Sequence, residues 1–280
     1  MGFPIGRNNH LLAFIHIEKT AGETIKWIFR SSNGLAHCDI APLWPRKEFK
    51  PLLPDELVWL RKIYPVLKSI GGHRVVPYTG LETIFPNIDY LTFIREPMQQ
   101  CASYFQYLYT VRRPDLRFDE WILTDWPRNI QTKRLCGEAN AEKAIEAVQL
   151  KKIFIGLQER FDESVLLFQT LKYPVLCPGY RARNVSPDNT IAKQLLSKTA
   201  TRDLIEEAVS EDKKLFAWVK ETLYPEYLQE FGEITGQHVP KKIEFGTQGF
   251  RNGYVYANLV YRNLVYKPAM WAHYRAGKKQ

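Results

Sequence analysis

Residues 11–24 read Leu11-Leu12-Ala13-Phe14-Ile15-His16-Ile17-Glu18-Lys19-Thr20-Ala21-Gly22-Glu23-Thr24. An apolar run comes first, and a lysine, a small flexible turn and an amphipathic stretch follow it. This order predicts a buried strand, a short loop and a helix. The first backbone N–H groups of such a helix have no partner within the helix, and that end of the helix carries partial positive charge. The stretch therefore predicts a binding site for an anion such as phosphate.

The position of the lysine separates this loop from the commonest nucleotide-binding loop. A Walker A loop has two glycines around four residues, then a lysine and a Ser or Thr whose hydroxyl reaches magnesium. Here Lys19 precedes Gly22 and stands at the end of the strand, and no magnesium-binding partner is evident. These features argue against a kinase or another transferase that uses ATP, which stays an alternative.

A second strand and helix are predicted over residues 89–111. Residues 89–94 have the pattern of a buried strand, and Pro97 suits the first turn of a helix. Apolar residues then recur at helical spacing and leave Ser103 off the apolar stripe. Arg95, at the end of the strand, and Ser103, about two helical turns later, are therefore expected to converge on one phosphate, with the arginine as a forked donor.

Both segments resemble signatures of the sulfotransferases that use 3′-phosphoadenosine 5′-phosphosulfate. Residues 14–24 resemble the loop that binds the 5′-phosphosulfate, and Ile94-Arg95-Glu96-Pro97 with the serine that follows resembles the segment that holds the 3′-phosphate. The similarity is greatest to the branch that includes the uronosyl 2-O-sulfotransferases and their bacterial relatives, and it extends loosely over residues 11–225.

The resemblance implies transfer of a sulfuryl group to an acceptor hydroxyl or amine, with adenosine 3′,5′-bisphosphate as the product and no metal. A carbohydrate hydroxyl is the favoured acceptor, while lipid, polyketide and small phenolic acceptors stay open.

The resemblance also assigns roles to individual residues. Lys19 is expected to bind the donor and to stabilise the charge that grows on the leaving phosphate. Arg95 and Ser103 are expected to hold the 3′-phosphate, while Arg183 and its neighbour Arg181 reach that phosphate or an acidic acceptor. The residues expected to bind the 5′-phosphosulfate, through backbone N–H groups and two threonine hydroxyls, are Thr20, Ala21, Gly22, Glu23 and Thr24.

Sulfuryl transfer to a hydroxyl needs a general base with a pKa near neutrality. The related branch carries its catalytic histidine in a Gly-His segment, and His73 in Gly71-Gly72-His73 stands between the two phosphate motifs. Glu18 and Glu23 are competing bases, and His16 is expected to be structural. The two glutamates stand where the family usually has proline and Ser or Thr, so a non-catalytic glycan- or lipid-binding protein that retains the fold also stays open.

Strands alternate with helices along the chain. Further strands are expected near residues 35–40, 71–75 and 152–157, and a long helix is expected from Thr201 to about Leu223. This order predicts an α/β fold, a P-loop-NTPase-like parallel sheet flanked by helices, with a mainly helical C-terminal half. In such sheets ligands bind beyond the carboxyl ends of the strands, where both motifs stand.

Two parts of the chain differ in composition. We expect a sulfotransferase domain over residues 1–245 and an aromatic, basic extension over residues 246–280. The extension is expected to pack on the domain or on a partner, or to contact a membrane surface or the acceptor.

The composition of the chain bears on its ligands, on metal binding and on its location in the cell. Lys and Arg number 39 against 30 Asp and Glu, and the net charge of +9 suits an anionic donor. No nucleic-acid-binding motif accompanies this charge. The four cysteines are too widely spaced to predict a zinc site or a redox motif. No apolar run is long enough to span a membrane, and the first strand begins too early for an ordinary signal peptide, so a cytoplasmic protein is expected.

Overall fold

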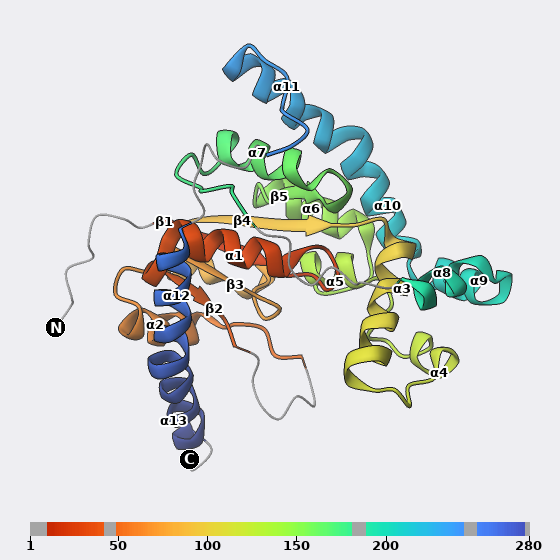
Figure 1. Cartoon of the computed structure of the whole chain (residues 1–280), viewed down its shortest axis with the longest axis horizontal. Helices are drawn as coiled ribbons and strands as arrows, with labels where there is room; N and C mark the ends of the chain where they lie inside the picture. The colour runs from red at the N-terminus through yellow and green to blue at the C-terminus, as the bar shows by residue number, and fades with distance from the viewer. Residues whose placement is uncertain (1–9, 42–48, 181–188, 244–250, 278–280) are drawn as a thin grey trace.

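The computed structural model describes residues 10–41, 49–180, 189–243 and 251–277. Within these residues it contains a five-stranded, all-parallel sheet with the strand order β2-β3-β1-β4-β5 (Figure 1). The strands are β1 (His10–Ile15), β2 (His37–Asp39), β3 (Ser69–Gly72), β4 (Asn87–Ile94) and β5 (Phe154–Leu157). Helices flank the sheet, so the predicted α/β fold is confirmed.

The central strand β1 lies between β3 and β4 and is the strand from which the candidate loop leaves the sheet. Its apolar run is buried, as expected for a parallel strand covered on both faces. In the register of the sheet, Ile15 lies opposite Gly72 of β3 on one side and Thr92 of β4 on the other. The chain steps from β1 to β2 and β3 and then crosses β1 to reach β4, so the direction of strand order reverses beside β1. Such a reversal is where open α/β sheets bind ligands.

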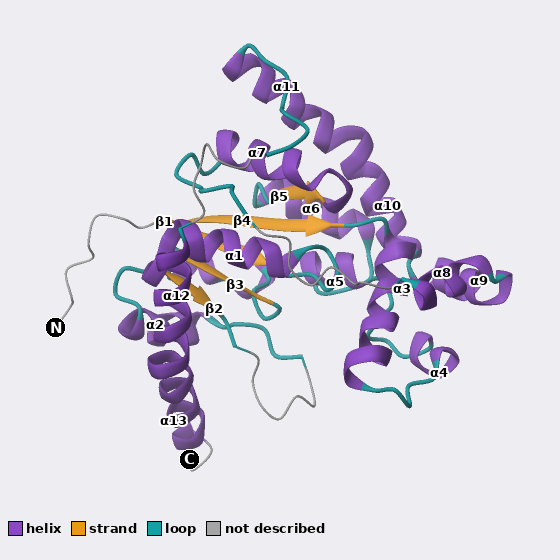
Figure 2. Ribbon diagram, in the orientation of Figure 1, coloured by secondary structure: helices purple, strands orange, loops and turns teal. Residues whose placement is uncertain are grey.

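The helices of the first half are α1 (Gly22–Asn33), α2 (Pro54–Ile63), α3 (Pro97–Tyr107) and α4 (Phe118–Ile122). Figure 2 shows the arrow of β4 pointing toward the end of the sheet at which α3 stands. The carboxylate of Glu96 caps α3 by accepting from the N–H groups of Met98 and Gln99. Pro97 occupies its first turn, where a missing N–H costs nothing.

The second half is mainly helical, as predicted. Its helices are α5 (Ile130–Cys136), α6 (Ala141–Leu150), α7 (Phe161–Leu171), α8 (Thr190–Ser197), α9 (Thr199–Ala208), α10 (Ser210–Trp218), α11 (Tyr224–Thr235), α12 (Asn252–Tyr261) and α13 (Lys267–Gly277).

The single helix predicted from Thr201 to Leu223 is wrong in its continuity. It is divided at Val209, and the reason lies in a distant residue. Asn129 accepts from the N–H groups of Glu211 and Asp212 and so caps α10, while Asp212 accepts from the N–H groups at the start of α5. These reciprocal caps begin two helices at once, and local helix propensity cannot reveal them.

Wide π-helical turns occur before prolines. Leu108–Arg112, Val219–Leu223 and Arg262–Tyr266 each end two residues before a proline. Proline lacks an N–H group and its ring collides with the carbonyl of the residue four positions earlier, so a widened turn relieves the clash. The last of these turns lets α12 run on into α13.

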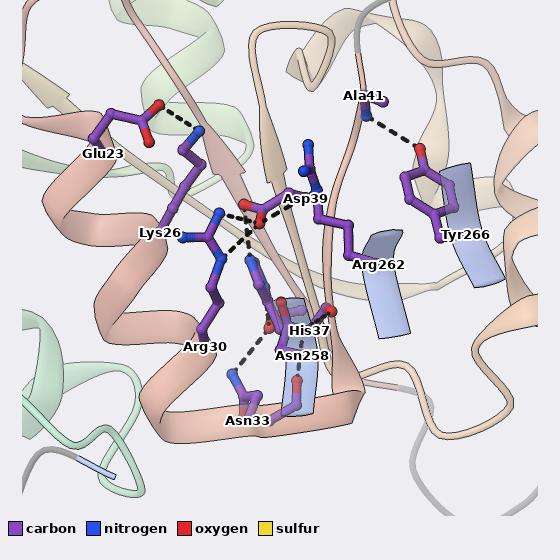
Figure 3. Close-up of polar contacts among 12 residues, drawn as sticks. Glu23, Lys26, Arg30, Asn33, His37, Asp39, Ala41, Asn258, Arg262 and Tyr266 are labelled. Atoms are coloured by element: carbon purple, nitrogen blue, oxygen red, sulfur yellow. Dashed lines mark hydrogen bonds and ion pairs between the residues drawn. The ribbon is translucent and has the colours of Figure 1, made fainter. Parts of the chain in front are cut away.

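Residues 252–277 are helical and pack on the elements around β2. The side-chain amide of Asn258 donates to the carbonyls of Gly34 and His37, at 2.8 and 2.7 Å. The Tyr266 hydroxyl accepts from the N–H of Ala41 at 3.1 Å (Figure 3). The expected division between domain and extension falls in residues 244–250, outside the described residues, and stays a prediction.

A buried polar chain joins α1 to β2 and β3. Arg30 donates from Nε and Nη2 to one oxygen of Asp39, at 2.8 and 2.5 Å. The ring of His37 lies between Asp39 Oδ1, at 3.3 Å from Nε2, and Ser69 Oγ, at 2.8 Å from Nδ1. Ser69, His37 and Asp39 are all buried, so no substrate reaches this serine, and the chain is structural.

Candidate functional site

A cavity of about 430 Å³ lies at the carboxyl edge of the sheet. Residues that follow four strands line it, namely Lys19 after β1, His73 after β3, Arg95 after β4 and Gln158 after β5. The candidate site residues found in its lining are Lys19, Ala21, Gly22, Glu23, Thr24, His73, Arg95 and Ser103. The two phosphate motifs, far apart in sequence, therefore share one cavity.

The loop between β1 and α1 is shaped for an anion. Lys19 and Ala21 have left-handed backbone angles, with φ of 64° and 69°. Turns that contain left-handed residues form concave arrays of N–H groups that bind anions. Within the described part of the chain, the N–H groups of Gly22 and Glu23, at the start of α1, have no protein acceptor. They carry the partial positive charge of the helix end into the cavity.

Gly22 is required by close packing. A Cβ atom on Gly22 would lie 1.9 Å from Cδ2 of His16, so any other residue would collide with that ring. The His16 ring in turn stacks on His73, with centroids 4.0 Å apart. Burial, and then the positive charges around it, lower the pKa of His16 well below its ordinary value. His16 is therefore neutral and structural, as the sequence analysis expected.

The hydroxyl of Thr20 is not available to a ligand. Thr20 is fully buried and donates to the carbonyl of Ile17 at 3.1 Å. The expectation that this hydroxyl points to the donor is wrong, because the tight turn needs it to hold the end of β1. Thr24, one helical turn later, does line the cavity.

Lys19 and Arg95 present two cations to the same space. The ammonium of Lys19 lies 4.9 Å from the centroid of the Tyr107 ring. Desolvation, and after it the charge of Arg95, lower the pKa of Lys19. Arg95 Nη2 lies 3.5 Å from Gln99 Oε1, and Arg95 Nε is buried without a partner among the described residues. An anion that contacts both cations would relieve their repulsion and supply the missing acceptor.

The side chain of Gln131 fixes the backbone of Arg95, a role that no sequence motif indicates. The amide of Gln131, on α5, accepts from the N–H of Arg95 and donates to its carbonyl, both at 3.0 Å. The next N–H, that of Glu96, donates to Glu159 at 2.7 Å. No local pattern relates Gln131 to Arg95, because the pairing depends on how α5 packs beside β4.

His73 is held in the tautomer that a base needs. Its Nδ1 lies 2.8 Å from the carbonyl of His16 and 3.3 Å from the carboxylate of Glu18, both acceptors. The proton therefore sits on Nδ1, and Nε2 keeps its lone pair. The side chain is 45% exposed toward the cavity. Desolvation lowers the pKa of His73; Glu18 raises it, and Arg134 and Lys26 lower it further, with a net decrease. The ring is neutral at neutral pH.

Glu18 anchors the loop through an ion pair. Arg134, from α5, donates to Glu18 Oε1 at 2.6 Å and to the carbonyl of His73 at 3.1 Å. Burial raises the pKa of Glu18, but the charge and the hydrogen bond of Arg134 outweigh burial, so the pKa is lowered and the carboxyl stays ionised. The Arg134 guanidinium also stacks over Phe49 and Trp126. Arg134 and Glu18 are 116 residues apart in sequence, so no local pattern reveals their contact.

Glu23 is paired on its own helix. Its carboxylate lies 2.5 Å from Nζ of Lys26, one turn along α1 (Figure 3). The side chain of Ala21 offers no cap, and Glu23 stands in the first turn, where a carboxylate favours the helix dipole. Its negative charge is thus balanced by Lys26, whereas Nε2 of His73 keeps a free lone pair, so His73 is the better placed candidate for a base.

Aromatic residues that no sequence motif indicates form one wall of the cavity. Tyr107 lies beside Lys19, and Tyr104 accepts from the indole N–H of Trp126 at 2.9 Å. Phe161 and Tyr180 pack edge to face, with centroids 5.0 Å apart. Flat aromatic and apolar surfaces of this kind suit a heterocyclic base.

Several expectations fall outside this site. Arg181 and Arg183 lie outside the described residues, so their roles stay predictions. Among the described residues no group of three or more His, Cys, Asp or Glu side chains is arranged to hold a metal ion. In the same part of the chain, no helix combines the length and the apolar character needed to cross a bilayer. Comparison of the sequence with models of protein families and with curated proteins finds no match.

Proposed function

We propose that this chain is a sulfotransferase that moves a sulfuryl group from 3′-phosphoadenosine 5′-phosphosulfate to an acceptor hydroxyl, with a glycan as the favoured acceptor. The observation that carries the proposal is the meeting of Lys19, Arg95, the unpartnered N–H groups of α1 and the neutral ring of His73 around one cavity. The charge, the N–H donors and the orphaned Nε of Arg95 fit a nucleotide with several phosphate groups.

The residues that line the cavity would have separate roles in the proposed reaction. When bound, the donor supplies an activated sulfuryl group whose bond to the 5′-phosphate breaks as the acceptor oxygen forms a bond to sulfur. The N–H groups of Gly22 and Glu23 and the ammonium of Lys19 would hold the 5′-phosphate and stabilise its growing charge. Arg95 and Ser103 would hold the 3′-phosphate. His73 Nε2 would take the proton of the acceptor hydroxyl.

The first test is ligand specificity. Adenosine 3′,5′-bisphosphate should raise the thermal unfolding temperature far more than ATP or adenosine 5′-monophosphate, because a ligand that binds the native state stabilises it by mass action. Greater stabilisation by ATP would favour the kinase alternative and overturn the proposal. Transfer of labelled sulfate to a panel of glycans and small alcohols then separates an enzyme from a binding protein.

Arg95→Ala tests the 3′-phosphate site directly. Loss of a charge-assisted contact should weaken binding of adenosine 3′,5′-bisphosphate by about tenfold or more, measured by calorimetry. Binding of adenosine 5′-monophosphate should change little. Arg113→Ala removes an exposed arginine near the end of α3 and serves as the matched control. Unchanged bisphosphate affinity in Arg95→Ala would count against the assignment.

A further inference from the structure

The inner face of the helical extension, residues 252–277, packs against the rest of the protein. From Asn252 to Gly277, α12, the π-helical turn and α13 span about 39 Å at the rise of an α-helix. Val255, Asn258 and Tyr266 are buried against the rest of the protein, and the Tyr261 hydroxyl donates to the carbonyl of Ile63. The extension is therefore held in place as a rigid element, which Figure 1 shows running away from the sheet past α2 toward the C-terminus.

The outer face of the extension is apolar. Tyr256, Val260, Leu264 and Trp271 are 65, 57, 72 and 57% exposed. Their spacing of four, four and seven residues places them on one stripe of the helix. We call these four residues the outer stripe. Lys267 is exposed in the gap between Leu264 and Trp271. A stripe of this size is uncommon on a surface that meets only water.

The sequence that carries the outer stripe has charges of a single sign, although one of its cations, Arg262, lies inward with Nε 3.9 Å from Asp39 Oδ2. Residues 245–280 contain no Asp or Glu, and their basic residues are Arg251, Arg262, Lys267, Arg275, Lys278 and Lys279. The guanidinium of Arg275 stacks on the ring of Trp271, at 3.7 Å from its centroid. The stripe thus combines Tyr and Trp rings with cations, which is the composition of helices that lie at the surface of a membrane.

We propose that the outer stripe docks α12 and α13 onto the surface of an anionic lipid bilayer, parallel to its plane. Apolar side chains would enter the boundary between headgroups and acyl chains, while the exposed side chains of Lys267 and Arg275 contact lipid phosphates. A second copy of this chain suits the stripe less well. A two-fold contact would bring the same patch together from both copies and place cations against cations, with no acid on the extension itself to separate them.

Vesicle sedimentation of the full chain tests this proposal. The protein should bind vesicles of phosphatidylglycerol and phosphatidylcholine and should bind pure phosphatidylcholine vesicles far less. Added salt should weaken the binding. Leu264→Gln with Trp271→Gln should lower the affinity at least about tenfold, because two exposed side chains lose their place in the apolar boundary. Both residues are exposed, so the fold should not change.

The matched control is Leu150→Gln, which replaces another strongly exposed leucine at the end of α6. It should leave vesicle binding unchanged. Failure of the unaltered protein to bind anionic vesicles would overturn the proposal, as would equal binding by the double variant. Sedimentation equilibrium that shows a dimer without lipid, dissociated by Leu264→Gln with Trp271→Gln, would assign the stripe to a second copy instead.

Discussion

At the scale of single residues, Lys19 is the cation in the cavity whose removal tests the proposed reaction most directly. Its ammonium is partly desolvated and close to the charge of Arg95, and its ring contact with Tyr107 is a weak tether. Lys19→Ala should lower kcat for sulfate transfer by about two to three orders of magnitude, which corresponds to about 2.7–4 kcal/mol of transition-state stabilisation. The left-handed backbone is strained equally by alanine and by lysine, since both carry a Cβ atom.

Stability measurements separate this effect from unfolding. The thermal unfolding temperature of Lys19→Ala should equal or exceed that of the unaltered protein, because the change removes a desolvated cation that another cation repels. Lys220→Ala, at an exposed lysine remote from the cavity, should change neither rate nor stability. A Lys19→Ala variant with normal turnover would contradict the proposed role of the ammonium.

The protonation of His73 should appear in the pH dependence of the rate. Only the neutral ring can accept a proton at Nε2, and the pKa of His73 lies below the ordinary histidine value. The plot of kcat/KM against pH should therefore stay high through neutrality and fall only below about pH 6.5. His73→Gln should reduce kcat by about 10²–10⁴ and abolish this acid limb.

His238→Gln, at an exposed histidine, provides the matched control and should keep both the rate and the limb. An acid limb that persists in His73→Gln would mean that a carboxylate, Glu18 or Glu23, is the base.

Between elements, the ion pair of Glu18 and Arg134 joins the β1 loop to α5. Both side chains are nearly buried, so removing one leaves an unpaired charge. Glu18→Gln and Arg134→Met should each cost about 3–5 kcal/mol of unfolding free energy, and the double variant should cost less than their sum. Urea denaturation of the four proteins measures this coupling. Loss of the Glu18 charge should also move the acid limb set by His73 to lower pH, because Glu18 raises that pKa.

The exposed pair of Arg128 and Glu207 offers a matched comparison. Its two atoms lie 2.7 Å apart, almost the distance in the buried pair, but Glu207 is largely exposed. Glu207→Gln should cost less than about 1 kcal/mol. Equal costs for Glu18→Gln and Glu207→Gln would show that the buried pair does not hold the loop.

The elements that the sequence predicted are those with local causes. The apolar run of β1 and the helix start after Gly22 define a strand, loop and helix without help from the rest of the chain. The same is true of β4, Arg95 and Pro97. Gln131 could not be foreseen, because it reaches Arg95 only after α5 has packed beside β4. The burial of the Thr20 hydroxyl likewise depends on how tightly the turn closes.

For the whole molecule, the protonation of three histidines links the cavity to the free energy of unfolding. The core holds His16 and His37, and His73 lines the cavity, and the pKa values of all three are lowered first by desolvation. These rings stay neutral in the native state at pH values where they take up protons in the unfolded chain. The fold thus keeps the rings of His16 and His73 neutral beside the cations Lys26 and Arg134, and acid should destabilise it.

The sign of this pH dependence follows from proton binding. Each of the three histidines has a native pKa below its unfolded value of about 6.5, so the unfolded state binds more protons as the pH falls through that value. The unfolding free energy should therefore decrease from about pH 7.5 to pH 6.5, by at most about 1.4 kcal/mol per pH unit for each proton taken up. Asp212, whose pKa burial raises to about 6, binds a proton in the native state as the pH approaches that value, so it offsets a small part of the loss near pH 6.5 and more of it at lower pH. Urea denaturation at the two pH values measures the decrease, and calorimetric unfolding in buffers of different ionisation enthalpy counts the protons. Unfolding that releases protons across this range, or a stability that rises as the pH falls, would mean that the three rings are charged in the native protein and that His73 is not the neutral base proposed above.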